Sequence, residues 1–92
     1  MAVVVVNEIA GGEQSLYEQV TSRVMPEGQL PDGCRDHIAG PMDGGWRVIS
    51  VWDSDEDFQR FRDESLMPAM QEAGGSMAPS VETKPVFRHI TA

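Results

Sequence analysis

The sequence lacks the residues and runs that several classes of protein require. It has one cysteine, Cys34, which excludes an internal disulfide framework and any metal site built from several cysteines. Its longest apolar run, residues 1–6, falls far short of the ~20 residues of a membrane helix. That run also has neither the length nor the basic flank of a signal peptide. We therefore expect a cytoplasmic protein with no membrane partner.

Basic side chains are also scarce. Seven Lys and Arg stand against fifteen Asp and Glu, which gives a formal net charge of −8. Such a surface repels phosphate backbones, so we expect no nucleic-acid partner. Apolar residues make up 40% of the chain and charged residues 24%, as in ordinary globular proteins. We expect residues 1–92 to form a single domain, because this length supports one core and no more.

The spacing of apolar side chains predicts six elements in the order β-α-β-β-α-β. A Val-rich run opens the chain with apolar side chains on both faces, as in a strand covered on both sides. Leu16, Val20 and Val24 recur every four residues and predict a helix. The predicted strands span residues 2–9, 34–39, 46–52 and 81–90, and the predicted helices span residues 13–25 and 54–73.

Glycines and a capping residue predict where elements end. Residues 40–45, with the sequence GPMDGG, form a turn cluster between the second and third strands, which predicts an antiparallel hairpin. Ser54 followed by Asp57 has the spacing of a capping box, which predicts that the second helix begins there. Gly74 and Gly75 are expected to end that helix.

Two prolines lie inside predicted elements. Pro68 gives up a helical hydrogen bond, so we expect a kink or a break at residues 65–68 of the second helix. Pro85 cannot donate to a ladder, so the last strand is expected at an edge of the sheet or irregular there.

This element order is that of the ferredoxin-like α+β fold. Four antiparallel strands in the order 4-1-3-2 carry two helices on one face. The other face then presents Ile49 and Val51 beside Arg47, with one set of first-strand valines. Leaving apolar surface in water costs about 25 cal/mol per Å². The apolar pattern therefore predicts a homodimer in which two copies pack sheet to sheet.

Several segments resemble the dimeric α/β-barrel proteins, the small proteins grouped with the antibiotic-biosynthesis monooxygenases. The main segment is GWRVISVWDSDEDF, residues 45–58. The resemblance implies a dimeric α/β barrel with a pocket in each monomer between the sheet and the helices. It also implies cofactor-free chemistry, in which a substrate such as an anthrone loses a proton and reacts directly with oxygen. The likeness continues at Phe61, Leu66, residues 68–70 and 73–74, and residues 37–41.

A heme-degrading branch of the same superfamily offers a test of the cofactor. In that branch an Asn late in the first strand and a Trp closing the third strand flank the heme, and a His on the second helix binds the iron. Asn7 and Trp52 are similar to the first two positions. Residues 58–70 contain no His, so the resemblance predicts no heme, and we expect no other cofactor.

Three residues are the main candidates for chemistry. Asn7 interrupts an apolar strand, and its amide could orient a reacting oxygen or bond loop backbone. His37 has a type of side chain whose ordinary pKa of about 6.5 suits a general base, or it is a partly exposed strand residue. Trp52 could stack on a flat substrate or anchor the core. We predict His37 and Asn7 as catalytic residues and Trp52 as a substrate-binding residue.

Other residues are expected to border the pocket or to lie apart from it. Tyr17, Ser50, Met67 and Met70 are predicted to line the substrate site, with core filling as the alternative. Trp46 is expected to cover a hydrophobic edge at the end of the hairpin.

Cys34 stands three residues before His37, which predicts side chains on opposite faces of one strand. His89 is expected on the last strand, three strand spacings from His37, so we predict no metal site for this pair. A contribution of His89 across a dimer stays open.

Two functions follow from these residues. The first is an enzyme that acts on a small apolar molecule, aromatic or polyketide-like, by cofactor-free oxygenation or a related proton transfer or cyclisation. The second is a non-catalytic ligand-binding or stress-related barrel that uses the same pocket without His37. The sequence leaves the substrate and the reaction open.

Overall fold

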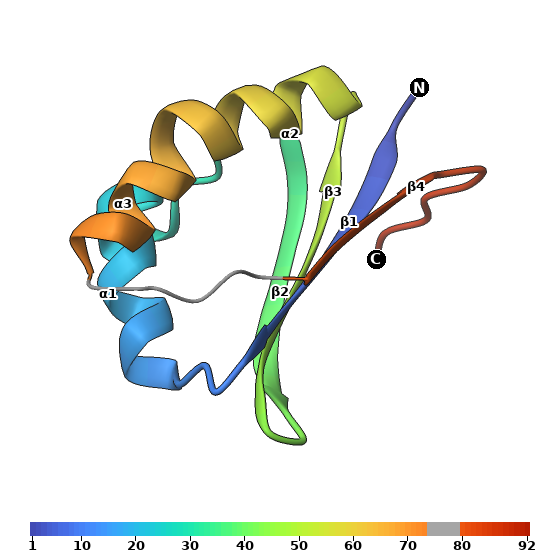
Figure 1. Ribbon diagram of the computed structural model, residues 1–92. Helices are drawn as coiled ribbons and strands as arrows, with labels where there is room; N and C mark the ends of the chain where they lie inside the picture. The colour runs from blue at the N-terminus through green and yellow to red at the C-terminus, as the bar shows by residue number, and fades with distance from the viewer. Residues whose placement is uncertain (74–79) are drawn as a thin grey trace.

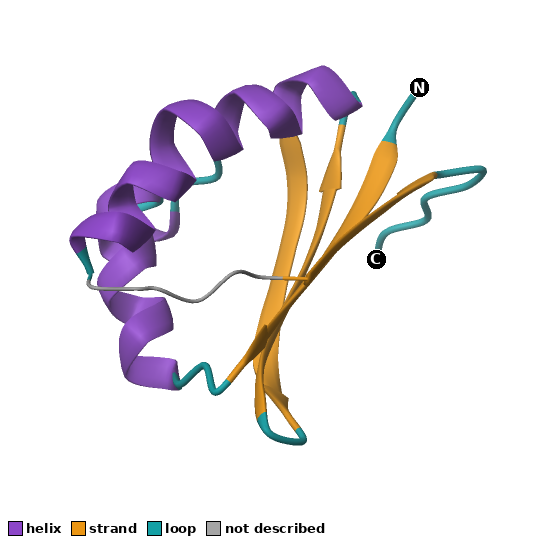
Figure 2. Cartoon of the chain, viewed as in Figure 1, coloured by secondary structure: helices purple, strands orange, loops and turns teal. Residues whose placement is uncertain are grey.

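The computed structural model describes residues 1–73 and 80–92, so Gly74 and Gly75 lie outside the described residues. Four antiparallel strands form one sheet in the order β2-β3-β1-β4, and the helices cover one face of it (Figures 1 and 2). This confirms the ferredoxin-like α+β fold. None of the described helices is long and apolar enough to cross a membrane. The strands are β1 (Val3–Ala10), β2 (Cys34–Met42), β3 (Gly45–Trp52) and β4 (Ser80–Pro85), and the helices are α1 (Gln14–Val24), η1 (Pro26–Gly28), α2 (Asp55–Phe61), η2 (Arg62–Leu66) and α3 (Met67–Glu72).

Strand β1 lies between β3 and β4, and its side chains alternate between the two faces of the sheet. Val3, Val5 and Asn7 are buried beneath the helices, whereas Val4 and Val6 are half-buried on the other face. The central position agrees with the Val-rich sequence. In a single chain, however, the helices cover only one of its two faces.

The hairpin of β2 and β3 is tighter than its glycine-rich sequence predicts. Met42 pairs with Gly45, so only Asp43 and Gly44 form the turn. Gly44 has a φ of 76°, which favours glycine. The expected turn over residues 40–45 is therefore wrong at its start, because β2 continues through Pro41. The edge position of β2 allows this, since an edge strand tolerates a residue without an N–H.

A bulge near the start of β2 reverses the alternation of its side chains. Cys34 pairs with Trp52 while Asp36 pairs with the preceding residue of β3, Val51, so Arg35 is the extra residue. Simple alternation from Cys34 would place His37 on the opposite face of the sheet. Because of the bulge, every side chain from Asp36 onward lies on the other face from the one that this alternation assigns. The predicted placement of Cys34 and His37 on opposite faces is therefore wrong.

The second helical region begins as predicted and departs from an α-helix in the middle. The Ser54 hydroxyl caps α2 by accepting the N–H of Asp57 at 3.2 Å. The segment η2 is a π-helical stretch, in which the N–H of Met67 reaches the carbonyl of Arg62, five residues earlier. The expected break at residues 65–68 is absent, because the backbone stays helical from η2 into α3, and the irregularity is this π-helical stretch at residues 62–66. Pro68 then falls in the first turn of α3, where its missing N–H costs little.

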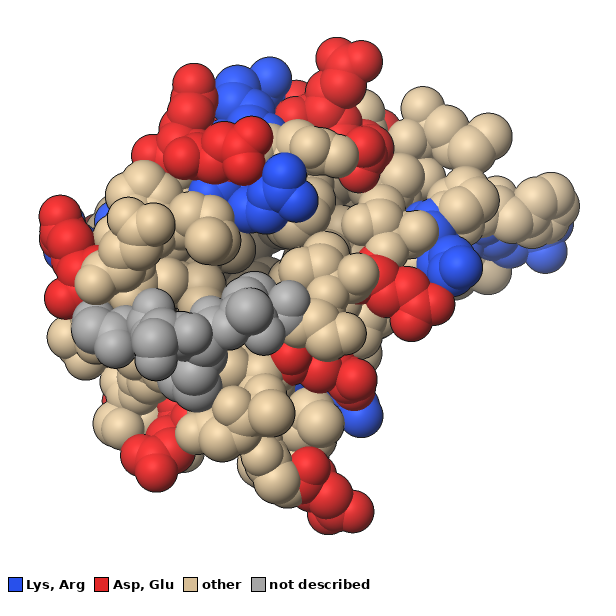
Figure 3. Space-filling model, viewed as in Figure 1, with Lys and Arg blue, Asp and Glu red and all other residues tan. Residues whose placement is uncertain are grey.

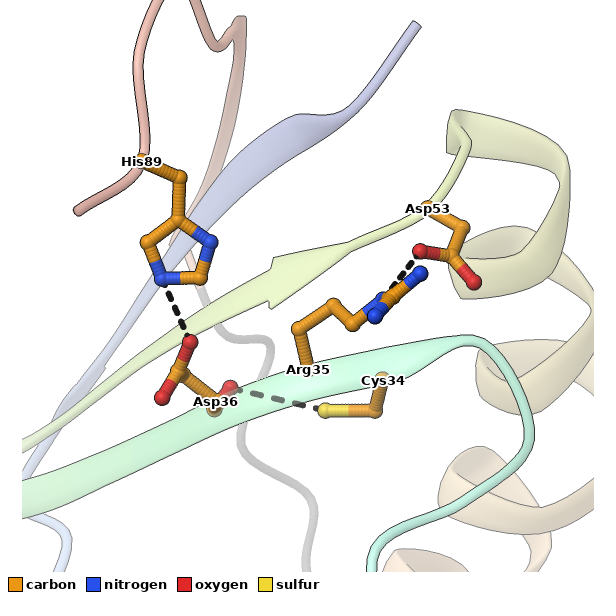
Figure 4. Close-up of polar contacts among 5 residues, drawn as sticks. All are labelled: Cys34, Arg35, Asp36, Asp53 and His89. Atoms are coloured by element: carbon orange, nitrogen blue, oxygen red, sulfur yellow. Dashed lines mark hydrogen bonds and ion pairs between the residues drawn. The ribbon is translucent and has the colours of Figure 1, made fainter. Parts of the chain in front are cut away.

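Strand β4 ends at Pro85, five residues before the predicted end. It lies at the edge of the sheet, as Pro85 predicted. The N–H of Val86 donates to the Ala2 carbonyl at 2.9 Å, and the chain then turns back (Figure 1). His89 Nε2 lies 2.6 Å from Oδ2 of Asp36 on β2, at the opposite edge (Figure 4). The C-terminal segment, residues 86–92, therefore crosses the face of the sheet that has no helices.

That open face carries apolar side chains, as the sequence predicted. The register places Val6 opposite Ile49 and Ile49 opposite Ile38, which is 64% exposed. Phe87 and Ile90 on the C-terminal segment are 93% and 81% exposed. Acidic groups lie at several places around the view in Figure 3, with basic groups near the helices and near the C-terminal segment. A second copy covering the open face stays a prediction.

Candidate active site

A cavity separates two parts of the core beneath the helices. One part packs Trp52 and Phe58 on the first-strand valines, and the other packs Val20 and Met70 between α1 and α3. The enclosed volume is about 80 Å³. Sites for drug-sized ligands span roughly 300–1,000 Å³, so only a fragment of such a ligand fits without side-chain movement. The polar side chains in its wall are Asn7, Glu13, Tyr17, Thr21, Cys34, His37 and Ser50.

Tyr17 and His37 meet in this wall. The Tyr17 hydroxyl lies 2.5 Å from Nε2 of His37, and the two rings stack at 5.8 Å with an interplanar angle of 27°. Burial lowers the pKa of His37 and raises that of Tyr17, because it disfavours the charged form of each. At neutral pH His37 is therefore uncharged and Tyr17 keeps its proton. The hydrogen bond therefore joins a neutral imidazole to a protonated phenol, and the tautomer of His37 determines which of the two donates.

Trp46 supplies a polar atom that the sequence analysis did not assign to the site. Its ring lies 5.3 Å from that of Tyr17, and it lines the cavity rather than covering an edge. Among the described residues its indole Nε1 is the one buried side-chain nitrogen or oxygen without a hydrogen-bond partner. An unpaired buried donor costs about 1–3 kcal/mol, which a ligand oxygen in the cavity could recover. Trp46 lies an even number of positions before Ser50 and Trp52 on one strand, so all three side chains lie on the same face. This spacing is the sequence signal that could have assigned Trp46 to the site.

Trp52 serves the core as well as the cavity. It is 2% exposed, packs edge-on against Phe58 at 5.6 Å and also contacts the ring of Phe61. Its Nε1 donates to Ser50 Oγ at 2.9 Å. Both Trp52 and Ser50 line the cavity. Since its donor is satisfied inside the protein, Trp52 offers a ligand an apolar ring and no N–H.

Asn7 is placed where a ligand could use its amide. It is 8% exposed and lines the cavity from β1. The described residues give its side chain no hydrogen bond, including none to the loop before Gly11. A buried amide of this kind has both donor and acceptor capacity left for a molecule inside the cavity.

The two methionines predicted for the pocket differ in position. Met70 is buried and lines the cavity, whereas Met67 is 37% exposed and is absent from its wall. The prediction for Met67 is therefore wrong. Ala69 and Met70 are the buried residues of α3, so the buried face of this helix is narrow. Met67 lies beyond the edge of that face.

Cys34 lines the cavity on the same side of β2 as His37. Its thiol donates to the Asp36 carbonyl at 3.4 Å. Burial raises the pKa of the thiol to about 11, so it stays protonated at neutral pH. A thiol in this state is a poor nucleophile, and the geometry gives it the role of a small apolar side chain.

His89 does not belong to this cavity, because it lies with Asp36 on the open face. No group of three or more His, Cys, Asp and Glu side chains forms a metal site within residues 1–73 and 80–92. Heme does not fit the residues present either. The cavity wall contains no His from α2, η2 or α3, and Nε2 of its one histidine is bonded to Tyr17.

Solved structures resemble this one over its whole length. SnoaB, a cofactor-independent oxygenase from Streptomyces nogalater, matches 99% of this chain and 98% of its own with a TM-score of 0.69 and 17% identity. The chain has the fold of the antibiotic biosynthesis monooxygenase-like proteins. The structure of Rv0793 from Mycobacterium tuberculosis matches with a TM-score of 0.72 and 15% identity, and the match covers 99% of this chain and 100% of Rv0793.

A third structure, from Chloroflexus aurantiacus J-10-fl, is described as a candidate antibiotic biosynthesis monooxygenase. It matches with a TM-score of 0.68 and 14% identity and covers 97% of each chain. No protein-family model and no curated protein sequence matches this chain. The monooxygenase-like resemblance of residues 45–58 is thus confirmed at the level of the fold.

Proposed function

We propose that the protein is an enzyme that removes a proton from a small, apolar, aromatic or polyketide-like molecule, which then reacts with oxygen without a bound cofactor. The observation that carries the proposal is the hydrogen-bonded pair of Tyr17 and His37 in the wall of the cavity. A neutral histidine with a lowered pKa is able to accept a proton at physiological pH. Among structures of the same fold, SnoaB is described as a cofactor-independent oxygenase.

The remaining polar groups fit the charge that such a reaction develops. Removal of a proton from a carbon that is conjugated with a carbonyl, directly or through an aromatic ring, places negative charge on the carbonyl oxygen. The Trp46 N–H has no protein partner among the described residues, and the Asn7 amide is able to donate; both residues line the cavity. Donors fixed in a dry site stabilise a developing oxyanion more strongly than water does. In this proposal they hold the oxygen while His37 receives the proton.

An anthrone is a suitable probe, because its central CH₂ lies opposite a carbonyl. Loss of one proton gives an aromatic enolate that reacts with O₂. Overall the CH₂ becomes a second carbonyl, and the other oxygen atom leaves as water with the two hydrogens. The reaction of anthrone with O₂ needs no external reductant. Three fused rings exceed the enclosed volume, so entry requires movement of the side chains that border the neighbouring groove.

The test is oxygen consumption with anthrone. We expect the wild type to exceed the spontaneous rate and His37→Gln to lose about 10²-fold, the usual contribution of one general base. His89→Gln is the matched control, because His89 is the second histidine of the chain and lies on the open face, away from the cavity. This variant should retain full turnover. Full turnover in His37→Gln would contradict the proposed role. Tight binding of anthrone without oxygen consumption would favour the non-catalytic ligand-binding barrel.

We also propose that the enzyme acts as a homodimer formed through the open face of the sheet. Val4, Val6, Ile49 and Val51 are half-buried there and Ile38 is exposed, so a second copy would remove all of them from water. The cavity lies on the opposite face of the sheet, so the proposed dimer leaves it free.

A further inference from the structure

Tyr17 and His37 border two separate spaces. One is the cavity beneath the helices, and the other is a more open groove of about 360 Å³ beside α1 and η1. Both residues line both spaces. Their hydrogen bond therefore lies in the partition between the apolar interior and a solvent-accessible surface. The other residues of the groove are Glu18, Thr21, Ser22, Met25, Glu27, Gly28 and Leu30.

The direction of this hydrogen bond limits what His37 can do by itself. In the tautomer that carries the ring proton on Nδ1, Nε2 accepts the hydrogen bond from the Tyr17 O–H and has no free lone pair for a substrate proton. Transfer of a proton from Tyr17 to Nε2 requires this tautomer. The described residues give Nδ1 no hydrogen-bond partner, which leaves it able to exchange with water. A direct transfer from substrate to Nε2 would first have to displace the Tyr17 hydroxyl.

We infer that Tyr17 takes the substrate proton and passes its own proton to His37, so that the pair conducts a proton from the cavity to the groove. In the transfer the substrate C–H bond breaks and a new O–H bond forms at Tyr17. The former Tyr17 proton moves to Nε2, which makes His37 an imidazolium. The Nδ1 proton then leaves to water in the groove, while Tyr17 keeps the substrate proton. The pair resets when exchange with water moves the remaining ring proton from Nε2 to Nδ1. Tyr17 thus becomes a catalytic residue and His37 the acceptor behind it.

The groove suits the release of a proton. Among the described residues that line it, Glu18 and Glu27 are the ionisable side chains besides the pair itself, and both are acidic. Acidic side chains at this surface attract a proton released into the groove. Thr21 and Ser22 already donate to helix carbonyls at 2.8 and 2.9 Å, so their oxygens remain as acceptors for water.

This inference rests on the proposed function, and its test has two arms. The first measures anthrone oxidation in Tyr17→Phe, His37→Gln and the double variant. We expect about 10²-fold loss in each single variant and no further loss in the double variant, because the two residues act as a unit. Phe retains the ring against Trp46, so anthrone affinity by calorimetry should stay within about twofold. Ser15→Ala, which removes a hydroxyl from α1 outside both spaces, is the control and should retain full turnover.

The second arm needs no turnover. Nitrogen-15 NMR of the wild type should show neutral His37 with its proton on Nδ1 and with Nε2 unprotonated, and Tyr17→Phe should shift the Nε2 resonance. A proton on Nε2 in neutral His37 would overturn the inference. Turnover that survives Tyr17→Phe within twofold would overturn it while leaving the proposed function intact. Absence of turnover in the wild type would overturn the proposed function, and the proton transfer with it, even if the NMR result is as expected.

Discussion

Cys34 and His37 face the same cavity although three residues separate them on one strand. The bulge at Arg35 causes this, because it adds one residue between Cys34 and Asp36 and so reverses the alternation. Arg35 itself points outward and pairs with Asp53 across the strand ends (Figure 4). The bulge therefore places a thiol in the interior and a guanidinium in water.

The buried thiol should react slowly. With its pKa raised to about 11, Cys34 contains little thiolate at pH 8. We expect iodoacetamide to modify the native protein at least about tenfold more slowly than the chain unfolded in urea, where the pKa of a cysteine is about 8.5. Mass spectrometry of timed samples measures both rates. Equal rates would show that the thiol is accessible and ionised.

The two tryptophans should respond differently to the same substitution. Trp46→Phe removes an indole N–H that has no partner, so the free energy of unfolding should change by less than about 1 kcal/mol. Trp52→Phe removes the hydrogen bond to Ser50 and should cost about 1–2 kcal/mol. Urea unfolding measures both. Anthrone affinity by calorimetry should fall about tenfold in Trp46→Phe, and an unchanged affinity would contradict its role as a donor to the ligand.

The pH dependence of stability should carry a contribution from His37. Its pKa is lowered in the folded state by burial, so protonation favours the unfolded chain. This stability is present above the ordinary pKa of about 6.5 and is lost as the pH falls through the lowered value of the folded state. His37→Gln should therefore lose less stability than the wild type between pH 7.5 and pH 5. Urea unfolding at the two pH values tests this, and an equal loss would contradict it.

A charge on the open face should separate the proposed dimer. Ile49→Lys places an ammonium opposite Val6 and beside Ile38, where a second copy would have to desolvate it. Sedimentation velocity should show a dimer for the wild type and a monomer for the variant, with unchanged circular dichroism. Gln71→Lys adds the same charge on exposed α3 and should remain dimeric. A monomeric wild type would disprove the dimer.

Local signals in the sequence predicted much of the fold. The apolar run of β3, the glycines of the hairpin and the cap at Ser54 all act through neighbouring residues, and each was placed within a few positions. Pro85 correctly indicated an edge strand for the same reason. Alternation along β3 also placed Ser50 and Trp52 on the cavity side.

Features that depend on contacts distant in sequence were missed. Nothing local signals the bulge at Arg35, and every inference from strand parity across it failed. The return of the C-terminal segment to Asp36 depends on the width of the whole sheet. The pairing of Tyr17 with His37 needs the packing angle of α1 on β2, which periodicity does not determine.

The tryptophan fluorescence of this protein comes from the wall of the cavity. Both tryptophans of the chain line it, and no other tryptophan contributes background emission. One indole N–H is bonded to Ser50 and the other is unpaired, so their excited states relax in different surroundings. A molecule entering the cavity changes the emission of the unpaired ring first, and single Trp→Phe variants assign the signal to each. Ligand entry can therefore be followed in real time on the unlabelled protein.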